Sequence, residues 1–364
     1  MNLHRLRTIV GIELRQRVRS VAWYVLLGVF AVILVGLLVL SFASFSLWSG
    51  GNELFFSFVI MLVLLLVLLV SPTLSGSAVN GDRDAATLAP VQITLATTVE
   101  IVVGKFLAAW ISGLAFLVVA LPFLLVSTFA GELNPLVILT SLLILVIEVG
   151  IVAAIGVGLS AIVARPLFSV ASTYLIVAAL TIGTLLAFGL GSTALRSTQE
   201  TVVRDIDVDS VPVGCNPYGP SDREGCPSPS EIGCVETTSY REVPRFDRVW
   251  WLLAANPFVI LADATPPTYD EEYGSPSDLF SQIAYGVRFA QIPPEPREVV
   301  QSCGQYLSQD QPPYETPEQQ IAGTTPSWFV GLLVQVVLAG GLMAWGIART
   351  RTPAKRLPPG TRIA

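Results

Sequence analysis

The chain has 364 residues, of which 52% are hydrophobic and 13% charged, and its mean hydropathy is +0.66. This balance excludes an ordinary water-soluble globular domain and predicts a membrane protein. The net charge of −6 hides a segregation of the two signs, because residues 191–326 hold 20 of the 27 acidic residues but only 8 of the 21 basic ones.

The first predicted element is an amphipathic helix within residues 1–20. Leu3, Leu6, Val10 and Leu14 recur at helical spacing, and arginines project from the opposite side. This pattern predicts a cytoplasmic helix that lies at the membrane interface. A basic tail that only sets the orientation of the chain is the alternative interpretation.

Six apolar windows are long enough to cross a hydrocarbon core of roughly 30 Å as helices. They cover residues 21–41, 54–74, 106–129, 135–163, 167–190 and 328–348. No small-residue cleavage site follows the first window, so it is predicted to be a span and not a removed signal peptide. We expect an all-α polytopic membrane protein, with transmembrane helices 1–5 in residues 21–190 and transmembrane helix 6 in residues 327–348.

Basic residues gather before the first span and in the tail, residues 349–364, that follows the last one. Because basic flanks stay in the cytoplasm, both termini are predicted to be cytoplasmic and the chain to be a multi-pass protein of the cell membrane. Counting inward from the ends places residues 75–105 in the cytoplasm, as the one sizeable cytoplasmic loop. Residues 191–326 then form an extracytoplasmic domain between transmembrane helices 5 and 6.

The cysteines agree with this orientation, since all of them fall in residues 191–326, the outer segment, and none in a span or a cytoplasmic loop. They are Cys215, Cys226, Cys234 and Cys303. An even set on an oxidising face predicts two disulfides, with three pairings open. A metal site is the alternative, but no histidine lies nearby and the spacings fit no zinc pattern.

Two apolar or amphipathic stretches stand out within the outer segment. Residues 248–264 are apolar but interrupted by Pro257, and they begin with two tryptophans, which favours a helix at the outer membrane interface. A seventh span is the alternative, although it would need an eighth to keep the C-terminus inside. Residues 278–291 are predicted to form an amphipathic helix with Ser277 as its N-cap.

Glu148 is the only charged residue within the six predicted spans. A lone carboxylate near the middle of a bilayer costs about 2.5 to 3.5 kcal/mol on insertion scales. Gly150, Ala154 and Gly158 recur at intervals of four on another face of the same helix, which predicts close helix packing there. Glu148 could mark a substrate or proton path. The favoured interpretation is structural, with a protonated group or one hydrogen-bonded to a neighbouring helix.

The sequence offers little catalytic chemistry. His4 is the sole histidine, so His-based triads and HExxH zinc sites are excluded. The pair Gly104-Lys105 is not a phosphate loop, because no glycine precedes it at the required spacing and no Ser or Thr follows the lysine. We therefore expect no catalytic residue, no metal site and no ATP hydrolysis in this chain.

The loop at 81–105 carries an acid-Arg cluster, Asp82 and Arg83, followed by an apolar stripe that includes Leu88, Val91 and Leu95. Such a stripe can press against a soluble partner while the charges form the rim of the contact. A surface helix that only reconnects two spans is the alternative.

The same loop resembles the cytoplasmic region of ABC type-2 exporter permeases. The matching residues are Asp82 and Arg83, then Thr87 and Leu88, and finally "EIVVGK" at residues 100–105. The chain departs from the family pattern in having Ala86 and Ala89 where Gly and Glu are usual, and in the early position of Pro90. The six spans, the amphipathic N-terminal helix and the cytoplasmic termini agree with the resemblance, which leaves the outer domain as a variable insertion.

The resemblance implies a permease subunit that moves a hydrophobic or amphipathic substrate, such as a drug, lipid or peptide, out of the cell. It also implies a separate nucleotide-binding ATPase subunit that binds ATP and Mg²⁺, a second permease copy, and a surrounding lipid bilayer, with no nucleic acid partner. The residues it assigns to ATPase coupling are Asp82, Arg83, Asp84, Thr87, Leu88, Val91, Leu95, Glu100 and Lys105. A membrane-anchored receptor or structural protein without an ATPase, whose outer domain binds a ligand, is the alternative.

Overall fold

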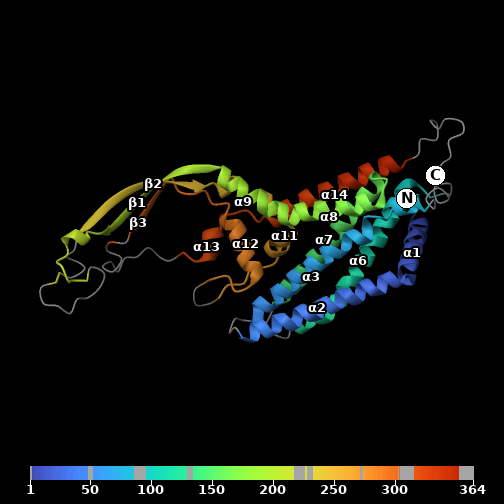
Figure 1. Ribbon diagram of the computed structural model, residues 1–364, viewed down its shortest axis with the longest axis horizontal. Coiled ribbons are helices and arrows are strands. Elements are labelled where there is room, and N and C mark those ends of the chain that lie inside the picture. Colours follow the sequence, from blue (N-terminus) through green and yellow to red (C-terminus); the bar gives the residue numbers. More distant parts are fainter. Residues whose placement is uncertain are drawn as a thin grey trace.

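The computed structural model describes residues 2–47, 52–85, 96–128, 134–216, 226–227, 233–270, 274–301, 303 and 315–351. Within them, six helical segments are long and apolar enough to cross a membrane. Figure 1 shows these helices side by side at one end of an elongated molecule, with a small sheet projecting from the other end. The predicted number of membrane-spanning helices is confirmed by length and composition.

The helices in chain order begin with α1 (Leu3–Arg19), α2 (Val21–Leu47), α3 (Asn52–Ser75), α4 (Asn80–Asp84), α6 (Thr98–Thr128) and α7 (Pro135–Ile162). They continue with α8 (Pro166–Ala178), a π-helical turn η1 (Ala179–Gly183), α9 (Thr184–Ala194) and the final α14 (Trp328–Thr350). The α8–η1–α9 run is a single candidate span.

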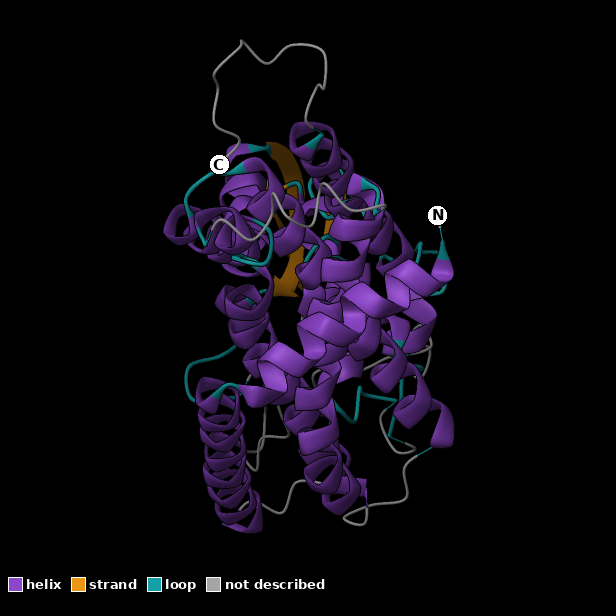
Figure 2. Ribbon diagram, turned by 90° about the vertical axis from the view of Figure 1, so that its right-hand side faces the viewer, coloured by secondary structure: helices purple, strands orange, loops and turns teal. Residues whose placement is uncertain are grey.

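Helices α3, α6 and α7 pack together in the middle of the bundle, where their apolar side chains form the main core. The most apolar window of α3 is 67% buried and that of α7 is 56% buried. The same fraction is 11% in both α2 and the α8–α9 run, so these two segments lie at the edge of the bundle and expose most of their apolar surface. Seen from the end where α1 lies and α14 ends, the helices form a bundle and the sheet lies behind them (Figure 2).

The predicted close packing along α7 is present, and α14 is its partner at Gly158. A Cβ on Gly158 would lie 2.8 Å from the backbone of Leu342, and one on Gly346 would lie 2.9 Å from the carbonyl oxygen of Gly158. Because these contacts are closer than real Cβ atoms make, the two helices can approach this far only with glycine at both positions.

The outer segment contains a sheet, so the prediction of an all-α protein is wrong. The strands β1 (Arg196–Ile206), β2 (Cys234–Pro244) and β3 (Arg297–Gln301) lie in the order β2-β1-β3. β1 and β2 pair antiparallel, from Arg196 opposite Pro244 to Ile206 opposite Cys234, and β3 pairs parallel to β1. β2 is exposed over most of its length. It therefore lacks the alternation of apolar and polar residues that reveals a half-buried strand in a sequence.

The rest of the outer segment is helical. It comprises 3₁₀ turns η2 (Val208–Ser210) and η3 (Phe246–Arg248), and helices α10 (Trp251–Ala254), α11 (Pro257–Ala264), α12 (Leu279–Phe289) and α13 (Pro317–Ile321). The predicted break at Pro257 is confirmed, because Pro257 begins α11 and Asn256 caps it. The predicted N-cap of α12 is wrong: Asp278 accepts a hydrogen bond from Ser281 N (2.7 Å), while Ser277 lies one residue outside the helix and donates to Thr268.

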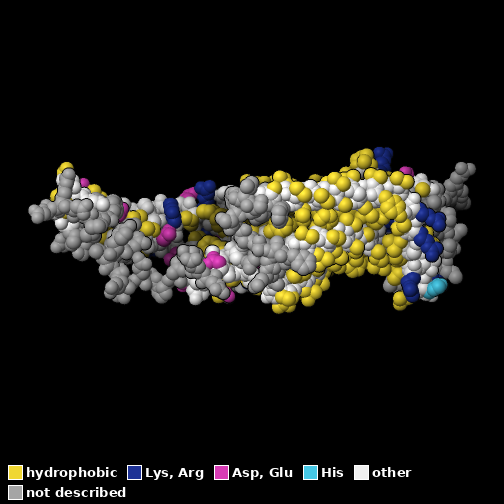
Figure 3. Space-filling view, turned by 90° about the horizontal axis from the view of Figure 1, so that it is seen from below, with side chains coloured by type: hydrophobic (Ala, Val, Ile, Leu, Met, Phe, Trp, Pro, Cys, Tyr) yellow, Lys and Arg dark blue, Asp and Glu magenta, His cyan; other side chains and the backbone are white. Residues whose placement is uncertain are grey.

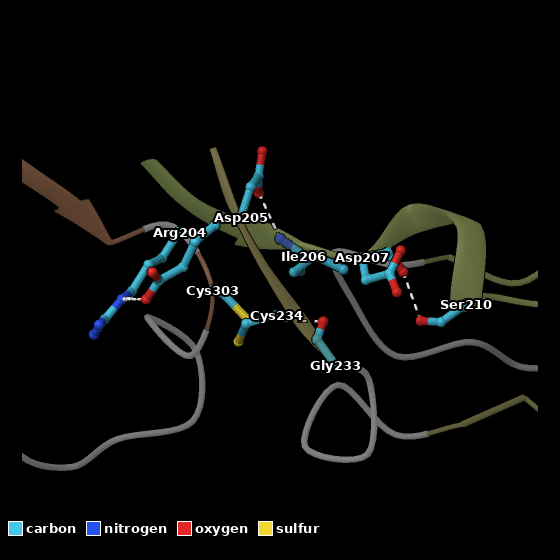
Figure 4. The surroundings of a disulfide bond; sticks show 9 residues. Arg204, Asp205, Ile206, Asp207, Ser210, Gly233, Cys234 and Cys303 are labelled. Atoms are coloured by element: carbon cyan, nitrogen blue, oxygen red, sulfur yellow. Dashed lines mark hydrogen bonds and ion pairs between the residues drawn. A yellow bond between two sulfur atoms is a disulfide. The ribbon is translucent and has the colours of Figure 1, made fainter. Parts of the chain in front are cut away.

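The four cysteines form two disulfides, as predicted, and the structure selects Cys215–Cys226 and Cys234–Cys303 from the three possible pairings. The second disulfide joins the start of β2 to the chain beyond β3, beside the end of β1 at Ile206 (Figure 4). It therefore closes the sheet across all three strands.

These disulfides lead to a labelling prediction. A membrane-impermeant thiol reagent applied to intact cells is expected to label the wild-type chain only after reduction, since no free cysteine exists in the folded chain and the outer segment is predicted to be extracytoplasmic. Cys303→Ser frees Cys234 and should be labelled without reductant, which makes it the matched control. Strong labelling of unreduced wild type would contradict the disulfides. A Cys303→Ser chain that reacts only in permeabilised cells would contradict the orientation.

Candidate functional site

The charged side chains divide between the two ends of the molecule. In Figure 3 a band of apolar side chains is bordered at one end by lysines and arginines, while the acidic side chains in view lie mostly towards the other end. The basic end is the one where α1 lies and α14 ends (Figure 1). Asp82, Arg83 and Lys105, which the sequence assigns to a coupling site, belong to elements at this end.

Helix α1 packs across the start of α6, and Gly104 permits this contact. Asn2 caps α1 by accepting a hydrogen bond from the backbone N–H of His4. Leu6 is the buried side chain of this helix. A Cβ on Gly104 would lie 2.7 Å from the Ile9 side chain. The glycine of the "EIVVGK" segment therefore serves the packing of α1 on α6.

Lys105 forms the centre of the charged cluster. Its side chain is only 3% exposed, and its ammonium group pairs with Glu13 of α1 and, at 2.5 Å, with Asp82 of α4. A buried ammonium group is tolerated only when carboxylates and hydrogen bonds replace its water shell. Two carboxylates from different helices do so here, so Lys105 joins α1, α4 and α6.

Glu100 holds the same region together through backbone groups. Its two carboxylate oxygens accept hydrogen bonds from Asn2 N (2.6 Å) and Thr97 N (2.9 Å), and Thr97 Oγ1 accepts one from Glu100 N (3.3 Å). The two reciprocal hydrogen bonds between Thr97 and Glu100 form a capping box at the start of α6. The bond to Asn2 fixes the beginning of α1, so Glu100 positions both α1 and α6.

The predicted coupling residues thus divide into three groups. Asp82, Glu100 and Lys105 are brought together with α1. Arg83 is half-buried and Asp84 exposed, and neither makes an ion pair within the part of the chain that the structure describes. The third group lies outside the described residues and consists of Thr87, Leu88, Val91 and Leu95.

Sequence reasoning missed two partners in this region. Glu13 carries a signal that could have indicated it, because it is the only acidic residue among the first twenty. The other is Ser160 in α7, whose hydroxyl accepts hydrogen bonds from Val79 N (2.8 Å) and Asn80 N (3.1 Å) and donates to Asn80 Oδ1 (3.0 Å). These bonds attach the start of α4 to the end of α7, and an apolar window offers no signal for them.

An open cavity of about 400 Å³ lies beside the charged cluster, between the α1–α2 turn and the end of α3. Arg17 lines it and donates from Nη2 to the carbonyl oxygen of Leu74 (2.7 Å). Burial lowers the pKa of the Arg17 guanidinium, and the negative charge of Glu13 opposes that shift. Arg17 joins α1 to α3 beside this cavity, while α1 packs mainly on α6.

Glu148 lies in the middle of α7 and is fully buried. It faces the side-chain amide of Gln335 in α14. Neither carboxylate oxygen has a hydrogen-bond partner among the described residues, and no described lysine or arginine pairs with it.

A second buried acid, Asp263 of α11, was not singled out from the sequence. One of its oxygens accepts from Arg288 Nε of α12 (2.5 Å), and the other accepts from the backbone N–H groups of Ser327 and Trp328 and from the Ser327 hydroxyl (2.9 Å). A carboxylate at this position compensates the unpaired N–H groups at the start of a helix. Asp263 therefore fixes the start of α14 to α11 and α12.

Asn256, between α10 and α11, completes the attachment of the outer segment to the bundle. Its amide donates to the carbonyl oxygen of Thr181 (2.7 Å) and to Thr184 Oγ1 (2.9 Å) at the π-helical turn. A π-helical turn leaves a backbone carbonyl without its usual partner, and Asn256 supplies one. Nearby, a Cβ on Gly331 of α14 would lie 1.8 Å from the Ala254 carbonyl oxygen, so this contact requires glycine.

Comparison of the chain with protein-family models, with curated proteins and with solved structures finds no match. Among the residues that the structure describes, no three His, Cys, Asp or Glu side chains are grouped so that they could hold a metal ion.

Proposed function

We propose that this chain is the permease subunit of an ATP-driven exporter of the ABC type-2 class. The residues at 82–105 that resemble this class motivate the proposal, and the Lys105 cluster is the observation that carries it. A force applied to α4 or to the loop that follows it would pass directly to α1 and α6 through the ammonium group of Lys105.

In this proposal a separate ATPase subunit binds ATP and Mg²⁺ and docks on the loop that follows α4. This chain holds no cofactor of its own and catalyses no reaction. Arg83 and Asp84, which remain exposed or half-exposed, form the rim of the contact, and Leu88, Val91 and Leu95 supply its apolar centre. Closure of the ATPase would tilt α1 and α6 together.

A second permease copy would complete the transporter. The two edge segments, α2 and the α8–α9 run, support this part of the proposal because they expose far more apolar surface than α3 or α7. In this arrangement the lipid bilayer covers what the second copy leaves exposed. The termini and the charged cluster lie in the cytoplasm, the disulfide domain lies outside the cell membrane, and the substrate is hydrophobic or amphipathic.

The test is co-purification of an ATPase from the native membrane with wild type and two variants. Truncating or charging an interface anchor costs more than about 2 kcal/mol, so Leu88→Asp is expected to weaken ATPase binding by at least about 30-fold while the permease stays inserted. Arg83→Glu should weaken coupling in a salt-dependent way, as a rim charge does. Arg297→Glu, an equally drastic change on the exposed strand β3, is the matched control and should have no effect on the ATPase.

Normal recovery of a fully stimulated ATPase with both loop variants would show that the loop is only a connector.

The second candidate function is a receptor whose outer domain binds a ligand, and the projecting sheet with its exposed strand β2 supports it. Purification of wild type without any ATPase, together with ligand binding by the outer domain, would favour that function.

A further inference from the structure

The contact between Glu148 and Gln335 contains more hydrogen-bond acceptors than donors. Both oxygens of Glu148 and Oε1 of Gln335 lack a partner among the described residues, and both side chains are fully buried. The amide nitrogen of Gln335, Nε2, donates one hydrogen bond to the carbonyl oxygen of Ala255 (3.0 Å) and makes none to Glu148. An ionised Glu148 would therefore present a negative charge to another acceptor in an apolar core, which is strongly unfavourable.

Among the residues that the structure describes, no cation compensates that charge. The elements that pack on α7 are α3, α6, α8, α11 and α14. Their described titratable side chains have other partners or lie at the helix ends. They are Glu100 and Lys105 at the start of α6, Tyr174 of α8, which donates to the Leu69 carbonyl oxygen, Asp263 of α11, which accepts from the start of α14, and Arg349 in the last turn of α14. The described side chains of α3 include no titratable group.

We propose that Glu148 and Gln335 form a buried proton-binding site, in which the Glu148 carboxylic acid donates its proton to Gln335 Oε1. One proton then satisfies the free acceptor of Gln335 and removes the uncompensated charge. The result is a continuous chain of hydrogen bonds from Glu148 through Gln335 to the Ala255 carbonyl oxygen. This chain connects α7, α14 and the turn that follows α10, which are the elements that meet at the α7–α14 packing and at Asn256.

The site does not depend on the exporter proposal, and it has a direct spectroscopic test. The difference in infrared absorption between wild type and Glu148→Gln at pH 7 is expected to contain the carbonyl stretch of one protonated carboxylic acid. Gln335→Met removes the acceptor, so the same band should move to higher frequency without disappearing. Replacement of sodium by choline in the buffer should leave the band unchanged, because the site binds a proton and not a metal cation.

The chain provides a matched control in Glu100, which is also a buried glutamate. Its carboxylate accepts two backbone N–H bonds, a set of partners that suits the ionised form. The difference between wild type and Glu100→Gln should therefore contain carboxylate bands and no carboxylic acid band.

Three results would overturn the proposal. One is a wild-type spectrum at pH 7 with no protonated carboxylic acid, which needs no variant and holds even if Glu148→Gln fails to fold. Another is a band that Gln335→Met leaves at the same frequency, because Gln335 would then not be the acceptor. The last is a band that appears only when sodium is removed, which would identify a cation site in place of a proton site.

Discussion

Replacing Lys105 with methionine is expected to lower the free energy of unfolding by about 3 kcal/mol. Methionine keeps most of the apolar stem but removes the ammonium group, which leaves Glu13 and Asp82 close together with no cation between them. The partial exposure of both carboxylates places the expected loss at the lower end of what breaking a buried ion pair costs. Unfolding in mixed detergent micelles provides the measurement.

Two further variants separate the charge from the packing of the side chain. Neutralising the carboxylates in the same chain, with Glu13→Gln and Asp82→Asn, should recover most of the loss caused by Lys105→Met. Arg297→Met breaks an exposed ion pair with Glu200 and should cost less than about 1 kcal/mol. If the triple variant is no more stable than Lys105→Met alone, the lysine stabilises the bundle by packing and the ion pairs contribute little.

Replacing Asp263 with asparagine is expected to lower the free energy of unfolding by about 3 kcal/mol as well. The change preserves size, but an amide has one acceptor oxygen where the carboxylate has two. Its NH₂ group must then face either Arg288 or the N–H groups of Ser327 and Trp328, all of which are donors. The start of α14 should lose its attachment to α11, which limited proteolysis of the outer segment would detect together with the unfolding measurement.

The opposite half of the Asp263 pair provides the control. Arg288→Met leaves the carboxylate with its backbone N–H and hydroxyl donors, so it should cost clearly less than Asp263→Asn. Equal losses for the two variants would indicate that the ion pair with Arg288, and not the helix N-terminus, is the principal partner of Asp263.

The spans could be predicted closely because the cause is local. A segment such as 135–163 is apolar throughout, and a chain in hydrocarbon satisfies its backbone groups only as a helix or a closed barrel. The observed α7, Pro135–Ile162, follows directly. The break at Pro257 is equally local, because proline lacks the N–H that a helix interior requires.

The sheet could not be predicted because its cause is not local. β1 pairs with β2 some 30 residues later in the chain and with β3 about 100 residues later, and each strand is polar on much of its surface. Because β2 is exposed over most of its length, the period of two that reveals a buried strand is weak. Cysteine content predicted two disulfides for the same segment, but their pairing depended on which strands come together.

The same division applies to the candidate site. The sequence placed Asp82, Glu100 and Lys105 in one cytoplasmic loop and assigned them together to a partner surface. The structure shows that all three face α1 or the start of α6. Charge type alone cannot distinguish a rim residue from a buried ion pair, because that distinction depends on a group, here Glu13, that is distant in sequence.

By itself the sequence determined the membrane class, the six helical spans, the even set of disulfides and the isolation of Glu148 among apolar residues, because each depends on composition over a single window. Only the tertiary structure decided which polar groups meet: Lys105 with Glu13 and Asp82, Asp263 with the start of α14, and Glu148 with Gln335. The physical reason is that a hydrophobic window is stabilised by its own transfer from water, whereas a buried polar group is stabilised only by its partner. That partner lies wherever the packing of the helices brings it.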